Sequence, residues 1–283
     1  MAERDLIENI RVLAWVHGVA MEAECKPTQT ALTVRFNELQ MEYLAAEKAA
    51  IAAMEENEDD KEDEGEKDWP EIQFQRYLVG GVTPSEVTLD RVELVLPTTK
   101  DAFLIGPKCD SGVAPLWLAM AGPIEAVRAV LNWYDDTLWR AQMAGVPLEQ
   151  LMFSVTDPIL PREIFLEYFP KWDLDVKRNV LAYAINKGET TISMERFTVL
   201  VALFRLSILS GIAYPMMDFV MTGLLHKAVY DLFDPWGIAR HVKVYLEILR
   251  DRQREAMAQG LEMLKKMNGG NDVRYQGDDE PTA

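Results

Sequence analysis

Apolar residues recur at alternating intervals of four and three positions in several long segments, and this spacing is typical of amphipathic α-helices. The clearest example lies between residues 32 and 50, where the apolar positions are Leu32, Phe36, Leu39, Tyr43, Ala46 and Ala50. A second example begins after Pro123, and a third begins after Asp234-Pro235. From residue 113 onward nearly every segment has this character and is separated from the next by proline. The sequence therefore predicts a mostly α fold.

The first 54 residues predict an antiparallel helical hairpin. Residues 3–24 carry apolar side chains at helical spacing, Lys26-Pro27 breaks the pattern, and Thr28 or Thr30 can cap the next helix. The 4-3 spacing of this second helix is that of a coiled-coil seam, and its alanine-rich end would allow close approach of a partner helix. Since such seams more often pack inside their own chain, the pattern is a modest indication of oligomerisation.

A strongly acidic run divides this hairpin from the rest of the chain. Residues 55–68, EENEDDKEDEGEKD, contain ten acidic and two basic residues, and such a run repels itself and cannot be buried. We therefore expect four parts: a helical hairpin over 1–54, an acidic linker over 55–68, a multi-helix body with a projecting C-terminal helix over 69–267, and a disordered acidic tail over 268–283.

Residues 72–106 leave helix and strand both open, so a small β element is possible there. The segment IQFQRYLV (72–79) suits a strand or a short helix. Thr83-Pro84-Ser85-Glu86 has the order of a helix start, which favours a helix from 84 to about 96, although VTLDRVELVL also alternates like a strand. DAFLIG (101–106) is the best strand candidate.

The charge and the cysteine content limit the class of protein. The 283 residues include 46 acidic and 29 basic side chains, a formal net charge of −17 that excludes a globally basic nucleic-acid coat. Two cysteines, Cys25 and Cys109, cannot form a disulfide framework and fit a reducing compartment. The N-terminus lacks the pattern of a secretory signal, so we expect a cytoplasmic, intracellular location.

The most apolar stretch, residues 197–233, predicts a buried helical hairpin rather than a membrane span. It carries Arg205 at the centre of its first half and several charged residues in its second half, which a span would exclude. A buried arginine needs a carboxylate partner, and Asp218, on the next helix, is the nearest candidate. We therefore expect a structural ion pair between Arg205 and Asp218 that fixes the register of the two helices.

No motif in the sequence predicts catalysis, and we expect neither a metal nor another cofactor. The chain has no phosphate-binding glycine loop, no nucleophile elbow and no histidine or cysteine pair at metal-ligand spacing. The pair Asp135-Asp136 lacks the further aspartate that a magnesium site would need. An enzyme with a dispersed site around Asp135, Asp136 or His226 remains an alternative, but a non-enzymatic protein is favoured.

Two regions predict contacts with a protein partner or a second copy. Tryptophan and tyrosine are dense between residues 117 and 172, and Trp133 and Trp139 lie on roughly opposite sides of one predicted helix. The last helix has an apolar seam only as far as Leu249, and beyond it a weak apolar strip remains. The candidate partner-binding residues are Trp133, Trp139, Met257, Leu261 and Leu264. They predict a helical interaction or assembly subunit.

A basic stripe on the last helix supports an alternative function. Arg240, Lys243, Arg250 and Arg254 fall on one face, and such a stripe can contact phosphates. The alternative is therefore a nucleic-acid-associated helical factor that uses these four side chains.

Overall fold

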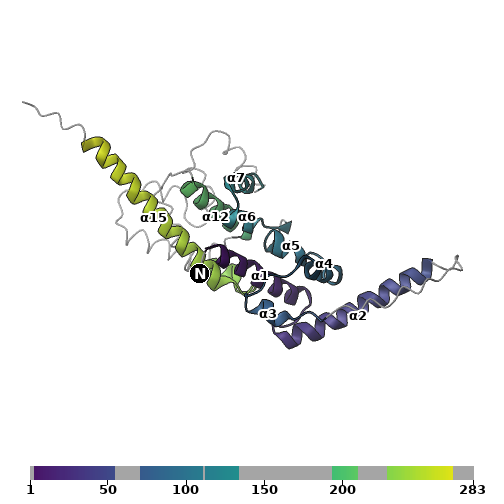
Figure 1. Cartoon of the computed structure of the whole chain (residues 1–283). Coiled ribbons are helices and arrows are strands. Elements are labelled where there is room, and N and C mark those ends of the chain that lie inside the picture. The colour runs from purple at the N-terminus through teal and green to yellow at the C-terminus, as the bar shows by residue number, and fades with distance from the viewer. Residues whose placement is uncertain (1–2, 55–70, 111, 134–192, 210–227, 270–283) are drawn as a thin grey trace, which may run out of the picture.

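The fold is built almost entirely from helices, as a computed structural model of the chain shows (Figure 1). The structure describes residues 3–54, 71–110, 112–133, 193–209 and 228–269. Of these residues 77% are helical, which confirms the predicted mostly α class. Within this part of the chain, the β-structure is one short antiparallel pair, β1 (Lys108–Cys109) and β2 (Gly112–Val113), with Lys108 opposite Val113.

Helix α1 (Glu3–Glu22) lies at the centre of the molecule. Two of its faces are apolar and are buried against other elements, whereas Asp5 is exposed and Glu8 and Arg11 are half-buried. One face packs with α6 (Leu116–Ala121) and α15 (Ala239–Gly269), and another packs with α3 (Phe74–Leu78) and α5 (Thr99–Leu104). The apolar positions that predicted the helix are all buried, and they are Leu6, Ile10, Leu13, Val16 and Ala20.

Helix α2 (Gln29–Met54) does not fold back along α1, so the predicted antiparallel hairpin is not formed (Figure 1). Its first turns, with Leu32 and Phe36 buried, pack against α3 and α4 (Glu86–Val95), and the remainder extends away from the body. The two apolar faces of α1 are covered mainly by α3, α5, α6 and α15, and α2 adds only two buried side chains, Leu32 and Phe36, to the second of these faces.

Residues 72–106 are helical throughout their regular parts. The predicted helix over 84–96 is confirmed as α4, but its N-cap is Ser85, whose side chain accepts a hydrogen bond from the Thr88 amide at 3.2 Å. The predicted strand over 101–106 is wrong, because Thr99–Leu104 forms α5 and buries Ala102 and Phe103. A short apolar run cannot by itself distinguish the two structures.

The β-pair follows directly after α5 and depends on one glycine. Gly106 has φ +156°, and a Cβ at this position would lie 2.0 Å from the carbonyl oxygen of Ala114. Only glycine allows the two backbone segments to approach so closely. The amide of Trp117 also donates to the Ile105 carbonyl at 3.2 Å, so this turn fixes the start of α6.

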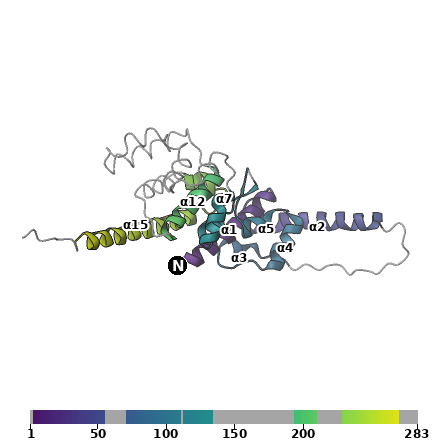
Figure 2. The same cartoon turned by 90° about the horizontal axis from the view of Figure 1, so that it is seen from above.

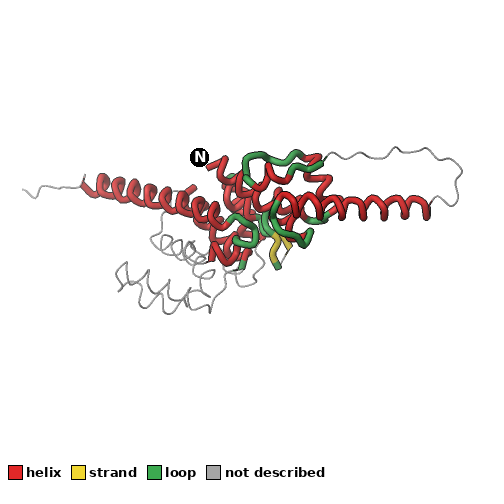
Figure 3. The backbone as a smooth tube through the Cα atoms, turned by 90° about the horizontal axis from the view of Figure 1, so that it is seen from below, coloured by secondary structure: helices red, strands yellow, loops and turns green. Residues whose placement is uncertain are grey.

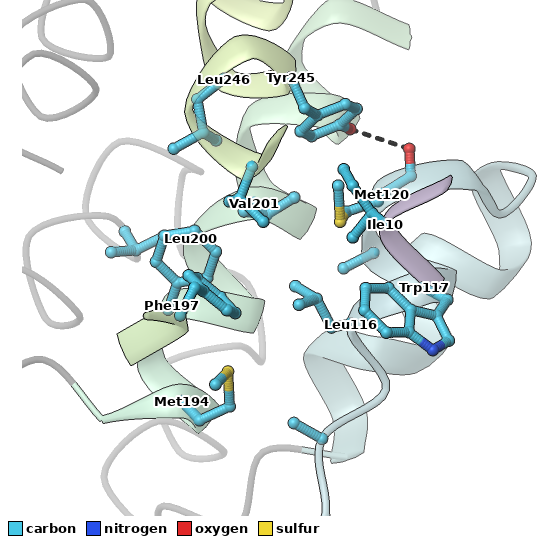
Figure 4. Close-up of a cluster of buried hydrophobic side chains, with 14 of the residues drawn as sticks. Ile10, Leu116, Trp117, Met120, Met194, Phe197, Leu200, Val201, Tyr245 and Leu246 are labelled. Atoms are coloured by element: carbon cyan, nitrogen blue, oxygen red, sulfur yellow. Dashed lines mark hydrogen bonds between the residues drawn. The ribbon is translucent and has the colours of Figure 1, made fainter. Parts of the chain in front are cut away.

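Two apolar clusters meet on α1. The first contains side chains from α1, α6, α7 (Ile124–Trp133), α12 (Met194–Leu209), α14 (Val229–Phe233) and α15, and Figure 4 shows part of it. The second contains side chains from α1 to α5. Most residues of helix α12 are buried, as the sequence predicted for the first half of the 197–233 hairpin. Residues 210–227, in the second half, lie outside the described part. No described helix has the length and apolar character that crossing a membrane requires.

Helix α15 is anchored by its first half and extends from the body by its second. Its buried seam continues through Leu249 to Gln253, which is 2% exposed. Beyond Gln253 the side chains that the structure describes are exposed or half-buried. Figures 2 and 3 show α15 and α2 leaving the body at opposite ends. The predicted linker 55–68 lies outside the described residues. Of the predicted tail over 268–283, the first two residues belong to α15 and the rest lie outside the described residues.

Candidate functional site

A cavity of about 490 Å³ lies where α1, α6, α12 and α15 meet. Three arginines from three different helices line it, namely Arg11 of α1, Arg205 of α12 and Arg252 of α15. The rest of its wall is one carboxylate and three apolar side chains: Glu8, Ile7, Met120 and Ala121. We call this the arginine cavity.

Arg11 is held from several sides. Its Nε donates to the carbonyl oxygen of Phe103 at 3.1 Å, and its Nη1 donates to Glu8 Oε2 at 3.2 Å. Its guanidinium also lies over the ring of Phe103, 4.6 Å from the ring centroid, which is a cation–π contact. These contacts fix the side chain in one orientation at the edge of the cavity.

Arg205 caps the C-terminal end of α6. Its Nη1 donates to the carbonyl oxygens of Gly122 at 2.8 Å and Ala119 at 3.3 Å. The Oη of Tyr245 donates to the neighbouring carbonyl oxygen of Met120 at 2.8 Å (Figure 4). The last carbonyls of a helix have no partner within the helix and carry partial negative charge, so a cation there is stabilising.

These contacts give Arg205 a structural role without a carboxylate. Asp218, the partner that the sequence predicted, lies outside the described residues, so the Arg205–Asp218 pair remains a prediction. Both described bonds of Arg205 use Nη1, so Nε and Nη2 have no partner within the described residues.

The arginine cavity has more positive than negative charge. Glu8 is the one carboxylate among its described lining residues, and both oxygens of Glu8 already accept hydrogen bonds, one from Arg11 and one from the Thr83 hydroxyl at 3.0 Å. Arg252 adds a third guanidinium from the exposed side of α15. Cations that converge on one cavity attract anions, and the planar guanidinium fork matches phosphate and carboxylate oxygens.

A second cavity, of about 530 Å³, lies between α3 and α4 and has balanced charge. Two basic side chains, Arg76 and Arg91, are offset there by Glu71 and Asp90. The cavity therefore shows no preference for the charge of a ligand, and the arginine cavity is the better candidate.

The basic stripe that the sequence predicted does not line the arginine cavity. Arg240 and Arg254 are exposed, whereas Lys243 and Arg250 are half-buried. The Nε of Arg250 lies 3.9 Å from the carboxylate of Asp251. The sequence analysis selected these residues by their spacing on one helix, and it missed Arg11 and Arg252, which meet Arg205 only through the tertiary fold. One signal was available, because Arg11, like Arg205, interrupts an apolar helix.

The predicted partner-binding residues are only partly described. Trp133 is half-buried and packs against the first apolar cluster. Trp139 lies outside the described residues. Met257, Leu261 and Leu264 belong to the projecting half of α15, where the structure describes the backbone at these positions but not their side chains.

No described cluster of side chains is suited to a metal. Within the described ranges, no three His, Cys, Asp or Glu residues come together, and Cys25 and Cys109 are not in a disulfide. Burial lowers the pKa of His17, and burial together with the nearby Arg240 lowers the pKa of His241.

The residues of the alternative enzyme site, Asp135, Asp136 and His226, lie outside the described residues, so this site remains a prediction.

Comparisons with protein families, with curated protein sequences and with solved structures each return no match for this chain.

Proposed function

We propose that this chain is a non-enzymatic assembly subunit that associates with further copies of itself through its two projecting helices. One observation carries the proposal: α2 and α15 leave the body at opposite ends, and no other described element packs against their outer turns (Figures 2 and 3). We call residues 41–54 the α2 arm and residues 254–269 the α15 arm. Isolated helices of this length are only marginally stable in water, because packing normally supplies most of their stability.

The α2 arm carries an uncovered apolar seam. The same 4-3 spacing that buries Leu32 and Phe36 in the body continues to Ala46 and Ala50, which are exposed. Met41 is also 67% exposed. Small side chains on such a seam permit close approach of another helix, so the arm has the pattern of an unpaired coiled-coil strand.

The α15 arm has the complementary charge. It contains three basic and two acidic residues, whereas the α2 arm contains one basic and two acidic residues and is followed in the sequence by the acidic run 55–68. Met263, 66% exposed, gives the α15 arm an apolar contact of its own. Because the arms point in opposite directions, the α2 arm of one copy can meet the α15 arm of the next. Such a head-to-tail contact builds rings or filaments.

Light scattering of the full chain over a range of concentrations tests the proposal. We expect a mass above that of one chain, and we expect it to rise with concentration. Substituting Ala46→Glu and Ala50→Glu places charge on the seam and should return the protein to a monomer. The matched control, Ala45→Glu with Ala52→Glu, adds the same charge on the opposite face of α2 and should leave the assembly intact.

Truncation tests the other arm. Ending the chain after Ala256 removes most of the α15 arm but keeps the buried Gln253, so the body should remain folded and monomeric. A chain that ends after Gly269 keeps the arm and should assemble like the full chain. A full chain that stays monomeric at high concentration, or seam and control variants that assemble equally, would overturn the proposal.

A further inference from the structure

We propose that the arginine cavity binds a phosphate group carried by a molecule of nucleotide size. This site is separate from the two arms, so the inference does not rest on the proposed assembly. The chemistry that would recognise the ligand is a doubly charged oxyanion next to an apolar or aromatic part.

Two of the three guanidiniums are oriented before any ligand arrives. The Phe103 carbonyl and ring hold Arg11, and the Ala119 and Gly122 carbonyls hold Arg205. A flexible arginine loses considerable side-chain entropy when it binds an anion, whereas a pre-oriented one loses much less. The cavity therefore presents donors at little further entropic cost.

Donors also remain available to a ligand. Arg205 uses only Nη1 in its described bonds, and Arg11 uses Nε and Nη1, so planar N–H groups of both residues are left. The carboxylate of Glu8 does not neutralise the cavity, because it is shared between Arg11 and Thr83 and is a single negative charge against three positive charges.

The size and lining of the cavity favour a phosphate with an organic part. Pockets for small ligands usually measure about 300–1,000 Å³, and the arginine cavity, at about 490 Å³, falls within this range. Three guanidiniums suit the several oxygens and the double charge of a terminal phosphate better than they suit a single carboxylate. Ile7, Met120 and Ala121 form an apolar wall against which a base or another planar group can pack.

Isothermal titration calorimetry on the full chain at low salt tests the proposal with three probes: inorganic phosphate, adenosine monophosphate and a single-stranded oligonucleotide without terminal phosphates. We expect adenosine monophosphate to bind more tightly than inorganic phosphate, because it also fills the apolar wall. If the natural source is nucleic acid, the oligonucleotide binds as well, and its affinity falls steeply with salt. If the source is a free nucleotide, only the probes with a terminal phosphate bind.

The variants separate this site from general charge attraction. Arg252→Gln should weaken adenosine monophosphate binding about tenfold, the effect of losing one charge-assisted contact. Arg254→Gln is the matched control, since it removes the same charge from an exposed position on the same helix outside the cavity, and it should change the affinity less than twofold. Glu8→Gln removes the competing carboxylate and should strengthen binding several-fold.

Two results would overturn the proposal. The first is that none of the three probes binds at millimolar concentration and low salt. The second is that Arg252→Gln and Arg254→Gln weaken binding equally, which would show attraction to the helix surface rather than to the cavity. Because Arg252 is exposed, the Arg252→Gln variant should fold like the unchanged protein. It therefore tests the site even where a substitution of the half-buried Arg205 prevents folding.

Discussion

Replacing Tyr245 with phenylalanine removes one hydroxyl group from the middle of the first apolar cluster and leaves the ring in place. Tyr245 is fully buried, and its hydroxyl is a hydrogen-bond partner of the Met120 carbonyl at the end of α6. A typical intramolecular hydrogen bond contributes about 1 kcal/mol, and a buried acceptor left without a partner costs about 1–3 kcal/mol. We therefore expect Tyr245→Phe to lower the free energy of unfolding by about 2 kcal/mol.

Urea unfolding followed by far-ultraviolet circular dichroism measures this change. The midpoint should fall while the slope with denaturant stays the same, because the surface exposed on unfolding does not change. The matched control is Tyr230→Phe, since Tyr230 is 39% exposed, and surface changes usually stay within about 0.5 kcal/mol. If Tyr245→Phe costs no more than Tyr230→Phe, the carbonyl end of α6 does not depend on this bond and the reasoning is refuted.

A double-mutant cycle extends the test to the whole helix end. Arg205 and Tyr245 bond to neighbouring carbonyls of α6, so Arg205→Met should also destabilise the protein, by about 2–4 kcal/mol. Both residues bond to the same end of α6. The loss of unfolding free energy in the double mutant should therefore differ from the sum of the two single-mutant losses by about 0.5–1 kcal/mol. Additivity within about 0.3 kcal/mol would show that the two contacts act independently.

The remaining predictions concern the backbone, a helix cap and pH. Gly106→Ala should lower the free energy of unfolding, followed by thermal melting, by more than about 3 kcal/mol, because its Cβ would meet a carbonyl oxygen 2.0 Å away. Gly81→Ala is the control and should be tolerated, because no atom lies within contact distance of a Cβ there. Ser85→Ala should lower the free energy of unfolding in urea by about 1 kcal/mol, because Ser85 is the N-cap of α4, and Thr83→Ala should lower it by less. A larger effect of Thr83→Ala would contradict Ser85 as the N-cap. Burial lowers the pKa of His17, so the unfolded state binds more protons below the ordinary value of 6.5. The free energy of unfolding should therefore fall as the pH drops below about 6.5, and the fall should be smaller in the His17→Gln variant. Equal pH profiles for the His17→Gln variant and the unchanged protein would disprove this role of His17.

The sequence predicted the helical class because apolar spacing is a local property that the chain displays directly. It did not predict where the first helix lies. The prediction used only one apolar face of α1, whereas Val12, Trp15 and Val19 supply a second face that is also buried. A helix with two apolar faces needs packing partners on both of them, and a single second helix in a hairpin cannot cover both.

The candidate site was predictable only in part. Arg205 was recognisable because a charge inside an apolar helix must have a structural or functional reason. Arg11 and Arg252 meet it through contacts between helices that are far apart in the sequence, and no local pattern reports such contacts. The error at DAFLIG has a different cause, since six apolar-rich residues suit a strand and a buried helix equally well.

The central position of α1 has a consequence for how the protein is made. Ile10 packs in the same cluster as Tyr245 and Leu246, so the packing of α1 is completed by a helix that lies far later in the sequence. At about 5–20 residues per second, synthesis of the intervening chain takes roughly ten to forty-five seconds. During that time this face of α1 can gain the native covering of α6 but not that of α15. The first apolar cluster can therefore be completed only after residues near 250 have been synthesised.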